Sequence, residues 1–241
     1  MKERVLKIAH LYPKLLNLYG DMGNIITLTK RCEWRGIKVE IDNINIGDEI
    51  GEHDFYFIGG GQDKQQQDVA CELFKHKSFL IQERDNGSVF LGICGGYQLF
   101  GHYYQPFEGD KLFGISLLDA YTVAGKKRFI GNVTIKTDFL SPDTLVGFEN
   151  HSGLTYLEGD TKPLGKVIVG NGNNGTDNLE GARFKNVFGT YLHGSLLPKN
   201  PQLADYLIRL ALEKRYGKCE LVPINDELEI NTHASLVGKV Y

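Results

Sequence analysis

The chain has 241 residues, of which 41% are hydrophobic and 24% are charged, and its formal net charge is -3 at pH 7. This composition is typical of a globular protein with one sizeable core and excludes general disorder. The negative net charge argues against a nucleic-acid binder that works by neutralising phosphates.

Several other classes of protein lack support in the sequence. No apolar run approaches the roughly 18 residues of a membrane span, and residues 1–10 do not resemble a signal peptide, so we expect a cytoplasmic protein without a transmembrane segment. The cysteines are widely spaced, and neither C-x-x-C nor H-x-x-x-H occurs, so we expect no disulfide and no metal site. A phosphate-binding loop of the GxxxxGK[S/T] type is also missing, so we expect no ATP site in this chain.

Apolar runs alternate with amphipathic stretches over the first 100 residues. We expect strands at residues 5–10, 38–46, 54–58 and 88–93, and helices at 24–35, 63–76, 77–85 and 97–101. The run at 54–58 is continuously apolar, as in a strand buried on both faces. Long connections between strands need parallel pairing, and helices cover both faces of a parallel sheet. The sequence therefore predicts a three-layer α/β fold with a mostly parallel central sheet.

The second half is richer in strands. We expect them at residues 129–137, 166–169, 182–184 and 187–192, followed by a helix at 201–216. The polar Gly/Asn stretch at 171–178 predicts a hairpin-like pair between the strands that flank it. No linker or repeat divides the chain, so we expect a single domain over residues 1–241 with its core at about 4–220. The tail at 221–241 has a weak pattern and is expected to be mobile or ordered by a partner.

The sequence GICGG at residues 92–96 is the sharpest feature of the chain. It follows an apolar run and precedes a predicted helix, as in a nucleophile elbow, where bulk two residues to either side of the nucleophile would clash. Backbone N–H groups at the start of the helix favour a thiolate at Cys94. We therefore predict Cys94 as a nucleophile, the alternative being a buried cysteine in a glycine-rich turn. Cys32, Cys71 and Cys219 have no such context and are expected to be structural.

A cysteine nucleophile needs a base. His193 follows the apolar run at 187–192 and precedes Gly194, and sites in open α/β sheets form at the carboxyl ends of strands. His151 is the competing candidate. Any single histidine, taken without other evidence, is more often structural.

Two more groups are candidates for binding a substrate. The glycine run at 59–61 also follows a strand, so the N–H of Gly60 or Gly61 and that of Gly95 are candidates for an oxyanion hole. A plain tight turn explains the glycine run equally well. Arg128 ends a basic run, which is either a solvated loop or the place of a guanidinium that clamps a substrate carboxylate.

These residues together resemble a known family. GICGGYQ at 92–98 and YLHG at 191–194 look like class I glutamine amidotransferase domains of the cobyric acid synthase subtype. Within that subtype, further segments are similar to the glutaminase subunits of lipid II isoglutaminyl synthases: LNLYGDMGNI at 16–25, FIGGG at 57–61, GFENH at 147–151 and GTYLHG at 189–194. The resemblance covers about residues 4–220.

The resemblance implies a flavodoxin-like fold and hydrolysis of L-glutamine to L-glutamate and ammonia through a thioester. It implies Cys94 as the nucleophile and His193 as general base and acid. Arg128 matches the family position that binds glutamine, and Gln98 of the GICGGYQ segment is a second substrate-binding candidate. Gly60 or Gly61 would complete the oxyanion hole with Gly95.

The resemblance also implies a partner. The ammonia would pass to a MurT-like, ATP-dependent Mur ligase subunit in a heterodimer. That ligase would amidate the α-carboxyl of D-glutamate in the stem peptide of lipid II. ATP and magnesium are expected only in the partner, so no cofactor is expected in this chain.

One position departs from the wider family. Many class I amidotransferases carry an acid two residues after the histidine, where it orients the imidazole, but this chain has Ser195. The cobyric acid synthase subtype departs there too. Glu149, another acid or a group of the partner could take the role, or the enzyme works as a dyad. Our hypothesis is that the partner supplies the group and so couples hydrolysis to complex formation.

Two other functions stay open. The chain could serve another acceptor, such as a corrinoid carboxylate, although cobyric acid synthases usually carry a fused synthetase domain that does not occur within these 241 residues. It could also be a non-catalytic amidotransferase-like module that only binds a partner. The joint presence of Cys94, His193 and Arg128 opposes the second alternative.

Overall fold

The computed structural model describes residues 4–17, 21–61 and 63–239. Its first half alternates strands and helices in the predicted order, with these bounds: β1 (Val5–Leu11), α1 (Met22–Glu33), β2 (Lys38–Ile44), β3 (Phe55–Ile58), α2 (Asp63–Lys75), α3 (Lys77–Asp85), β4 (Val89–Ile93) and α4 (Gly95–Phe100). The second half comprises β5 (Tyr103–Gln105), β6 (Leu112–Phe113), β7 (Ala120–Lys136), β8 (Thr144–Leu157), β9 (Gly165–Val169), β10 (Leu179–Glu180), β11 (Ala182–Phe184), β12 (Val187–Thr190), the 3-10 helix η2 (Leu197–Lys199), α5 (Pro201–Tyr216) and α6 (Glu227–Leu236).

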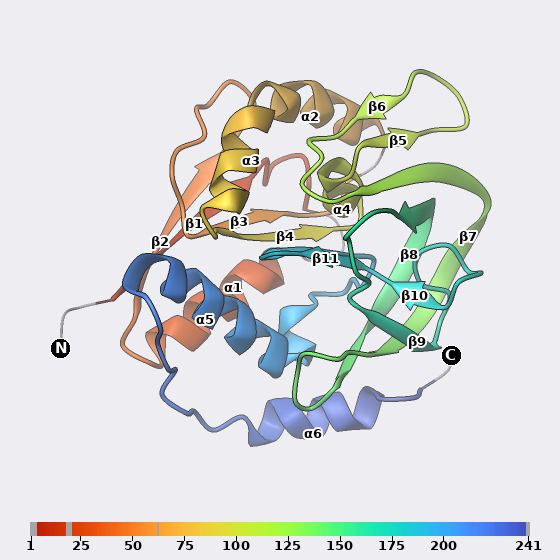
Figure 1. Cartoon of the computed structure of the whole chain (residues 1–241). Helices are drawn as coiled ribbons and strands as arrows, with labels where there is room; N and C mark the ends of the chain where they lie inside the picture. The colour runs from red at the N-terminus through yellow and green to blue at the C-terminus, as the bar shows by residue number, and fades with distance from the viewer. Residues whose placement is uncertain (1–3, 18–20, 62, 240–241) are drawn as a thin grey trace.

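The central sheet is mostly parallel, as the sequence predicts. Its strand order is β11-β12-β4-β3-β1-β2, and every pair is parallel except β11 with β12. Strands β12, β4 and β3 are therefore neighbours, and their carboxyl ends lie at one edge of the sheet. Figure 1 shows α2 and α3 on one face of this sheet and α1 and α5 on the other.

Strand β3 explains why both faces are covered. All four of its residues are fully buried. Phe55 and Phe57 belong to one apolar cluster with residues of α1 and α5, whereas Tyr56 and Ile58 belong to a second cluster with residues of α2 and α3. Because side chains alternate across a strand, a continuous apolar run fills two layers at once. The prediction of a strand buried on both faces is confirmed.

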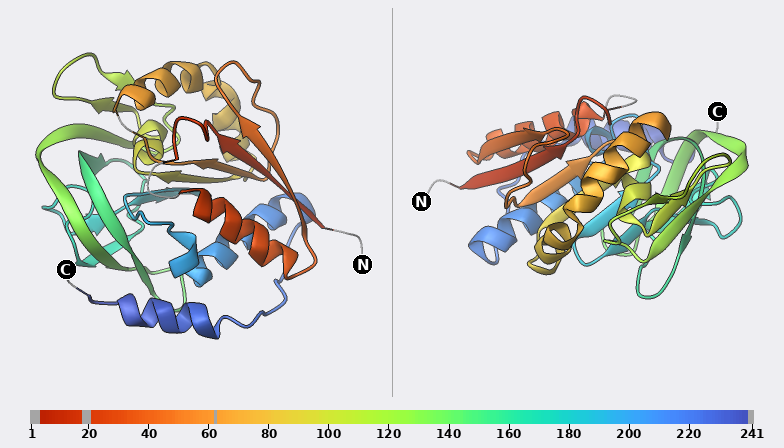
Figure 2. Two further views of the ribbon diagram at one scale, coloured as in Figure 1. Left: turned by 180° about the vertical axis from the view of Figure 1, so that it is seen from behind. Right: turned by 90° about the horizontal axis from the view of Figure 1, so that it is seen from above.

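A second sheet of mixed pairing lies at the end of the molecule away from the N-terminus, as both views of Figure 2 show. Its order is β10-β9-β7-β5-β6, with β8 paired to β7. The predicted hairpin across the polar stretch at 171–178 is present, but its second strand is β10 and not residues 182–184. β9 pairs with β10 in this sheet, while β11 pairs with β12 in the central sheet. The polar stretch therefore connects two strands of the second sheet, and the chain passes to the central sheet at Gly181, between β10 and β11.

The C-terminal part of the chain contacts the rest through polar groups. Arg31 of α1 is almost fully buried and donates to Asp205 and Asp226 at 2.6–2.8 Å. In α6, His233 contacts Thr144 Oγ1 at 2.9 Å and the carbonyl oxygen of Lys199 at 2.8 Å. The expectation that the tail is mobile or ordered by a partner stays a prediction. No helix within the described residues has the length and apolar content to cross a membrane.

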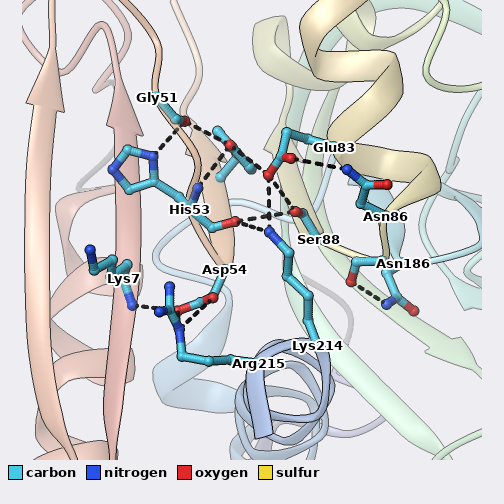
Figure 3. A network of polar contacts seen from close by, with 12 residues as sticks. Lys7, Gly51, His53, Asp54, Glu83, Asn86, Ser88, Asn186, Lys214 and Arg215 are labelled. Atoms are coloured by element: carbon cyan, nitrogen blue, oxygen red, sulfur yellow. Dashed lines mark hydrogen bonds and ion pairs between the residues drawn. The ribbon is translucent and has the colours of Figure 1, made fainter. Parts of the chain in front are cut away.

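A buried polar network ties the end of α5 to the start of β3 (Figure 3). Lys214 donates to Glu83 at 3.0 Å and to the carbonyl of His53 at 2.8 Å. Tyr56 and Ser88 also donate to the Glu83 carboxylate, which is 3% exposed. Burial alone would raise the pKa of Glu83, but these donors, Lys214 first, bring the pKa below its ordinary value.

We predict that Glu83→Ala destabilises the fold by about 3 kcal/mol, because it leaves the Lys214 ammonium half-buried without its partner. The lowered pKa means that the contribution is complete above the ordinary carboxyl pKa of 4.5 and is lost as the pH falls further. Urea unfolding at neutral and at acidic pH measures both effects. Glu40→Gln, which alters an exposed ion pair with Lys38, is the control and leaves the midpoint unchanged. Equal midpoints for wild type and Glu83→Ala at neutral pH would contradict the prediction.

Candidate active site

Cys94 stands in a strained turn between β4 and α4. Its backbone has φ 51° and ψ -106°, a left-handed conformation that side chains other than glycine rarely adopt. Its N–H donates to the carbonyl of Thr190 at 2.8 Å, which extends the pairing of β4 with β12 by one step. This is the geometry that a nucleophile elbow requires.

The glycines on either side of Cys94 are needed for steric reasons. A Cβ at Gly96 would lie 2.5 Å from the carbonyl oxygen of Ile58, and one at Gly92 would lie 2.8 Å from the Phe100 ring. Contacts this short do not occur in folded proteins, so the turn is possible only with glycine at these two positions. The steric reasoning behind the elbow motif is borne out by these distances.

His193 lies three residues beyond the end of β12, next to the elbow. Its backbone forms an isolated bridge with Phe148, with N–H···O distances of 2.8 and 3.3 Å. The side chain is 1% exposed. Burial, and after it the nearby groups His151, Arg128 and Lys199, lower the pKa of His193 to about 3. The imidazole is therefore uncharged near neutral pH, the state in which it accepts a proton.

The predicted residues meet around Gly60, just beyond β3. A Cβ built on Gly60 would lie 3.2 Å from His193 Cε1, 3.3 Å from Cys94 Cβ and 3.4 Å from Asp21 Oδ2. Three neighbouring strand ends thus deliver a thiol, an imidazole and a glycine turn to one point, where open α/β sheets form their sites. Asp21 lies within the segment at 16–25 that resembles the family, but the sequence does not predict it as a site residue.

The other oxyanion candidates lie beside this point. The backbone nitrogen of Gly61 is 3.2 Å from the position that a Cβ on Gly95 would take, so the two chain segments are in close contact. The N–H of Gly60 donates to Asp21 Oδ2 at 2.6 Å. Within the segment at 16–25, residues 18–20 lie outside the described part of the chain.

Arg128 and the histidine that competed with His193 lie close by. Arg128 is exposed on β7, beside a register shift between Ala124 and Phe129, and donates to Asn150 Oδ1 at 2.6 Å. Its positive charge contributes to the lowered pKa of His193. His151 stacks on Tyr191 with ring centroids 3.6 Å apart and contacts the carbonyl of Gly153.

Glu149 supports a loop. Its carboxylate accepts three hydrogen bonds from Asn171 and one from Gly172, at 2.5–3.1 Å. The side chain is 1% exposed. These bonds occupy the lone pairs of both oxygens, so Glu149 is engaged with the loop between β9 and β10.

Gln98 belongs to a buried polar chain behind the elbow. Its oxygen accepts from Gln66 at 2.7 Å and its nitrogen donates to the Tyr191 hydroxyl at 3.1 Å. Tyr191 in turn contacts Thr155. The amide thus links α2, α4 and the segment that carries His193, and its role as a substrate contact stays a prediction.

One group of potential metal ligands occurs within the described residues, namely His102, Asp119 and Glu158. Their ligand atoms lie within 4.8 Å of one another. His102 Nε2 and Asp119 Oδ1 already contact each other at 2.7 Å, and both side chains are substantially exposed. Exposed pairs of this kind are common without a metal, and none of the three residues belongs to the group around Gly60.

We predict that Gly96→Ala lowers kcat for amide hydrolysis by about 100-fold, because the clash with Ile58 displaces the elbow by a fraction of an ångström or more. It also destabilises the fold by about 1–3 kcal/mol. Gly51→Ala is the matched control, since a Cβ there meets nothing within 4 Å and should leave both quantities unchanged. Steady-state kinetics and thermal unfolding of both variants measure this, and wild-type kcat in folded Gly96→Ala would contradict it.

Comparison with known proteins agrees with this geometry. Residues 7–201 match the CobB/CobQ-like glutamine amidotransferase domain. The chain is 42% identical to "Lipid II isoglutaminyl synthase (glutamine-hydrolyzing) subunit GatD" of Staphylococcus aureus, covering 97% of this chain and 96% of that one. It is 42% identical to the protein of the same name from Streptococcus pneumoniae, covering 92% and 86%.

Solved structures show the same fold at low identity. A crystal structure of a glutamine amidotransferase superposes with a TM-score of 0.58 at 13% identity, covering 84% of this chain and 98% of that one. The architecture is thus that of the class I glutamine amidotransferases, with the three-layer arrangement expected from the sequence. The chain belongs to the CobB/CobQ-like glutamine amidotransferase family.

Proposed function

We propose that this chain is the glutaminase subunit of a lipid II isoglutaminyl synthase and hydrolyses L-glutamine to L-glutamate and ammonia. The observation that carries the proposal is the meeting of Cys94, His193 and the Gly60 turn at three adjacent strand ends. Identity of 42% over nearly the whole chain to two proteins named as that subunit supports the specific acceptor.

The chemistry follows from the state of each group. The uncharged His193 accepts the thiol proton of Cys94, and the sulfur attacks the side-chain carbonyl carbon of glutamine. The tetrahedral intermediate collapses, the C–N bond breaks, and the nitrogen takes the proton from His193 and leaves as ammonia. Water, deprotonated by His193, then attacks the thioester carbonyl, and glutamate leaves as the proton returns to Cys94.

Two other groups act on the substrate in this proposal. One N–H of the glycine turn and the N–H of Gly95 stabilise the negative charge on the former amide oxygen in both tetrahedral intermediates. Arg128 binds the α-carboxylate of glutamine through its guanidinium. Its exposure on β7 and its electrostatic effect on His193 fit a group at the mouth of the site.

The ammonia serves a partner in this proposal. A MurT-like ligase subunit forms a heterodimer with this chain in the cytoplasm and transfers the nitrogen to the α-carboxyl of D-glutamate in lipid II. ATP and magnesium belong to that ligase. The names of the two relatives, which describe a subunit of a synthase, support the partnership.

We predict that Cys94→Ala abolishes glutamate release, with a loss of at least about 10³-fold, because no other group can form the thioester. Coupled detection of glutamate from L-glutamine, with the ligase partner present, measures it. Cys71→Ala, which removes an exposed thiol, is the control and keeps the wild-type rate. Wild-type turnover by Cys94→Ala would contradict the proposed mechanism.

The third group that orients His193 is also proposed to come from the partner. Glu149, the acid suggested by the sequence, is bound to Asn171 and Gly172. Among the described residues, the cations Arg128 and Lys199 and the neighbouring His151 lower the pKa of His193. An acid of the ligase placed beside His193 would stabilise the imidazolium that forms during catalysis.

We predict that the partner raises kcat for glutamine hydrolysis at least about 10-fold, since one positioned electrostatic group contributes this much or more. Glutamate release by the chain alone and by the purified complex, at saturating glutamine, measures the ratio. Equal rate constants would contradict the coupling, while leaving the assignment of Cys94 and His193 intact.

A further inference from the structure

Asp21 is a buried carboxyl group at the catalytic centre. It is 0% exposed, and its Oδ2 lies at the point where Cys94 and His193 meet. It stands directly before α1, and the start of that helix contacts the segment after His193. There, Asn24 accepts a hydrogen bond from the N–H of Leu197 at 2.9 Å. The start of α1, held by this contact, thus places Asp21 beside Cys94 and His193.

Asp21 stands at the N-terminal cap position of α1, but its side chain does not cap the helix. An Asp before a helix normally accepts hydrogen bonds from the first helical N–H groups. Here the carboxylate makes no such bond to α1, and Asn17 accepts the N–H of Met22 instead. Asp21 turns away and accepts the N–H of Gly60, 39 residues along the chain, at 2.6 Å. Helix capping therefore does not explain it.

Burying this carboxyl is costly. Its Oδ1 has no hydrogen-bond partner among the described residues. Burial raises the pKa of Asp21 to about 7, although the Gly60 N–H opposes the shift. Buried polar atoms without hydrogen-bond partners are uncommon. A costly buried carboxyl that does not cap its own helix, placed at a catalytic centre, suggests a role in function.

Asp21 binds a backbone N–H in the glycine turn at 59–61, a segment with high conformational freedom. Gly59, Gly60 and Gly61 follow one another without a side chain, so the peptide planes of the turn are free to rotate unless something fixes them. Asp21 fixes one plane through the Gly60 N–H. The next plane carries the N–H of Gly61, whose nitrogen is beside Gly95. With the Gly60 donor engaged, Gly61 is the donor that the turn can offer to an oxyanion.

We propose that Asp21 is a positioning residue whose carboxylate holds the Gly60 N–H and so orients the glycine turn that supplies an oxyanion donor beside Cys94. The proposal rests on the proposed glutaminase function. Asp21 acts through the turn, so it affects the stabilisation of the tetrahedral intermediates more than the binding of glutamine.

The test compares two substitutions in the complex of the full chain with its ligase partner. Asp21→Ala removes the acceptor and is expected to lower kcat about 10- to 100-fold with KM for glutamine changed less than about twofold. Asp21→Asn keeps an oxygen that can accept the Gly60 N–H and is expected to stay within about threefold of wild-type kcat. Rescue by Asn with loss confined to kcat distinguishes positioning from a loss of stability.

Asp54 provides the matched control. It is the residue before the first residue of β3, at the end of that strand away from the site. It is 1% exposed and also accepts a backbone N–H, that of Lys7 at 2.9 Å. Asp54→Ala is expected to lower the melting temperature while the folded protein keeps its kcat. An Asp21→Ala loss of kcat no larger than that of Asp54→Ala would overturn the proposal.

Two other outcomes would also overturn it. A rise in kcat for Asp21→Ala would mean that the carboxylate competes with the oxyanion for the Gly60 N–H. An Asn variant as slow as the Ala variant would mean that accepting this bond is not what matters. A wild-type complex that releases no glutamate would refute the glutaminase function instead. In that case the NMR chemical shift of the Gly60 amide proton would test the hydrogen bond to Asp21 independently of activity. The bond predicts a shift that Asp21→Ala changes and Asp21→Asn retains.

Discussion

The site depends on one constraint, the left-handed backbone of Cys94 between a buried strand and a short helix. That turn places a side chain at the edge of the sheet, and it exists only because Gly92 and Gly96 leave room for Phe100 and Ile58. The parallel pairing of β4 with β3 and β12 then brings the glycine turn and His193 to the same edge. The meeting of Cys94, His193 and the glycine turn is thus a consequence of strand order.

Electrostatics at this edge keep His193 in its uncharged form but disfavour the imidazolium that the first proton transfer creates. His193 is held uncharged by burial and by neighbouring cations, so it is available as a base. Asp21 is also buried, and its raised pKa reflects the same low exposure. A site this dry strengthens the interactions of any charge that develops during the reaction, which suits acyl transfer through an oxyanion.

The central sheet and the residues around Cys94 could be predicted from the sequence because local pattern encodes them. Each of these features is encoded by residues next to one another in the sequence: the apolar run of β3, the GICGG segment and the histidine after β12. The second sheet could not be predicted equally well, since β9 and β11 have similar short patterns yet join different sheets. Asp21 could not be found either, because its partner, the N–H of Gly60, is 39 residues along the chain and no local pattern links the two.

In the proposed function, Cys94 alone of the four cysteines is the activated nucleophile of a glutamine-binding site. Mass spectrometry after treatment with a glutamine-like chloroketone tests it most directly. We predict one adduct, on Cys94, whose formation slows when L-glutamine is added, and no adduct on Cys71 although that thiol is exposed. Labelling governed by exposure, with Cys71 modified first and no protection by glutamine, would refute Cys94 as the activated nucleophile.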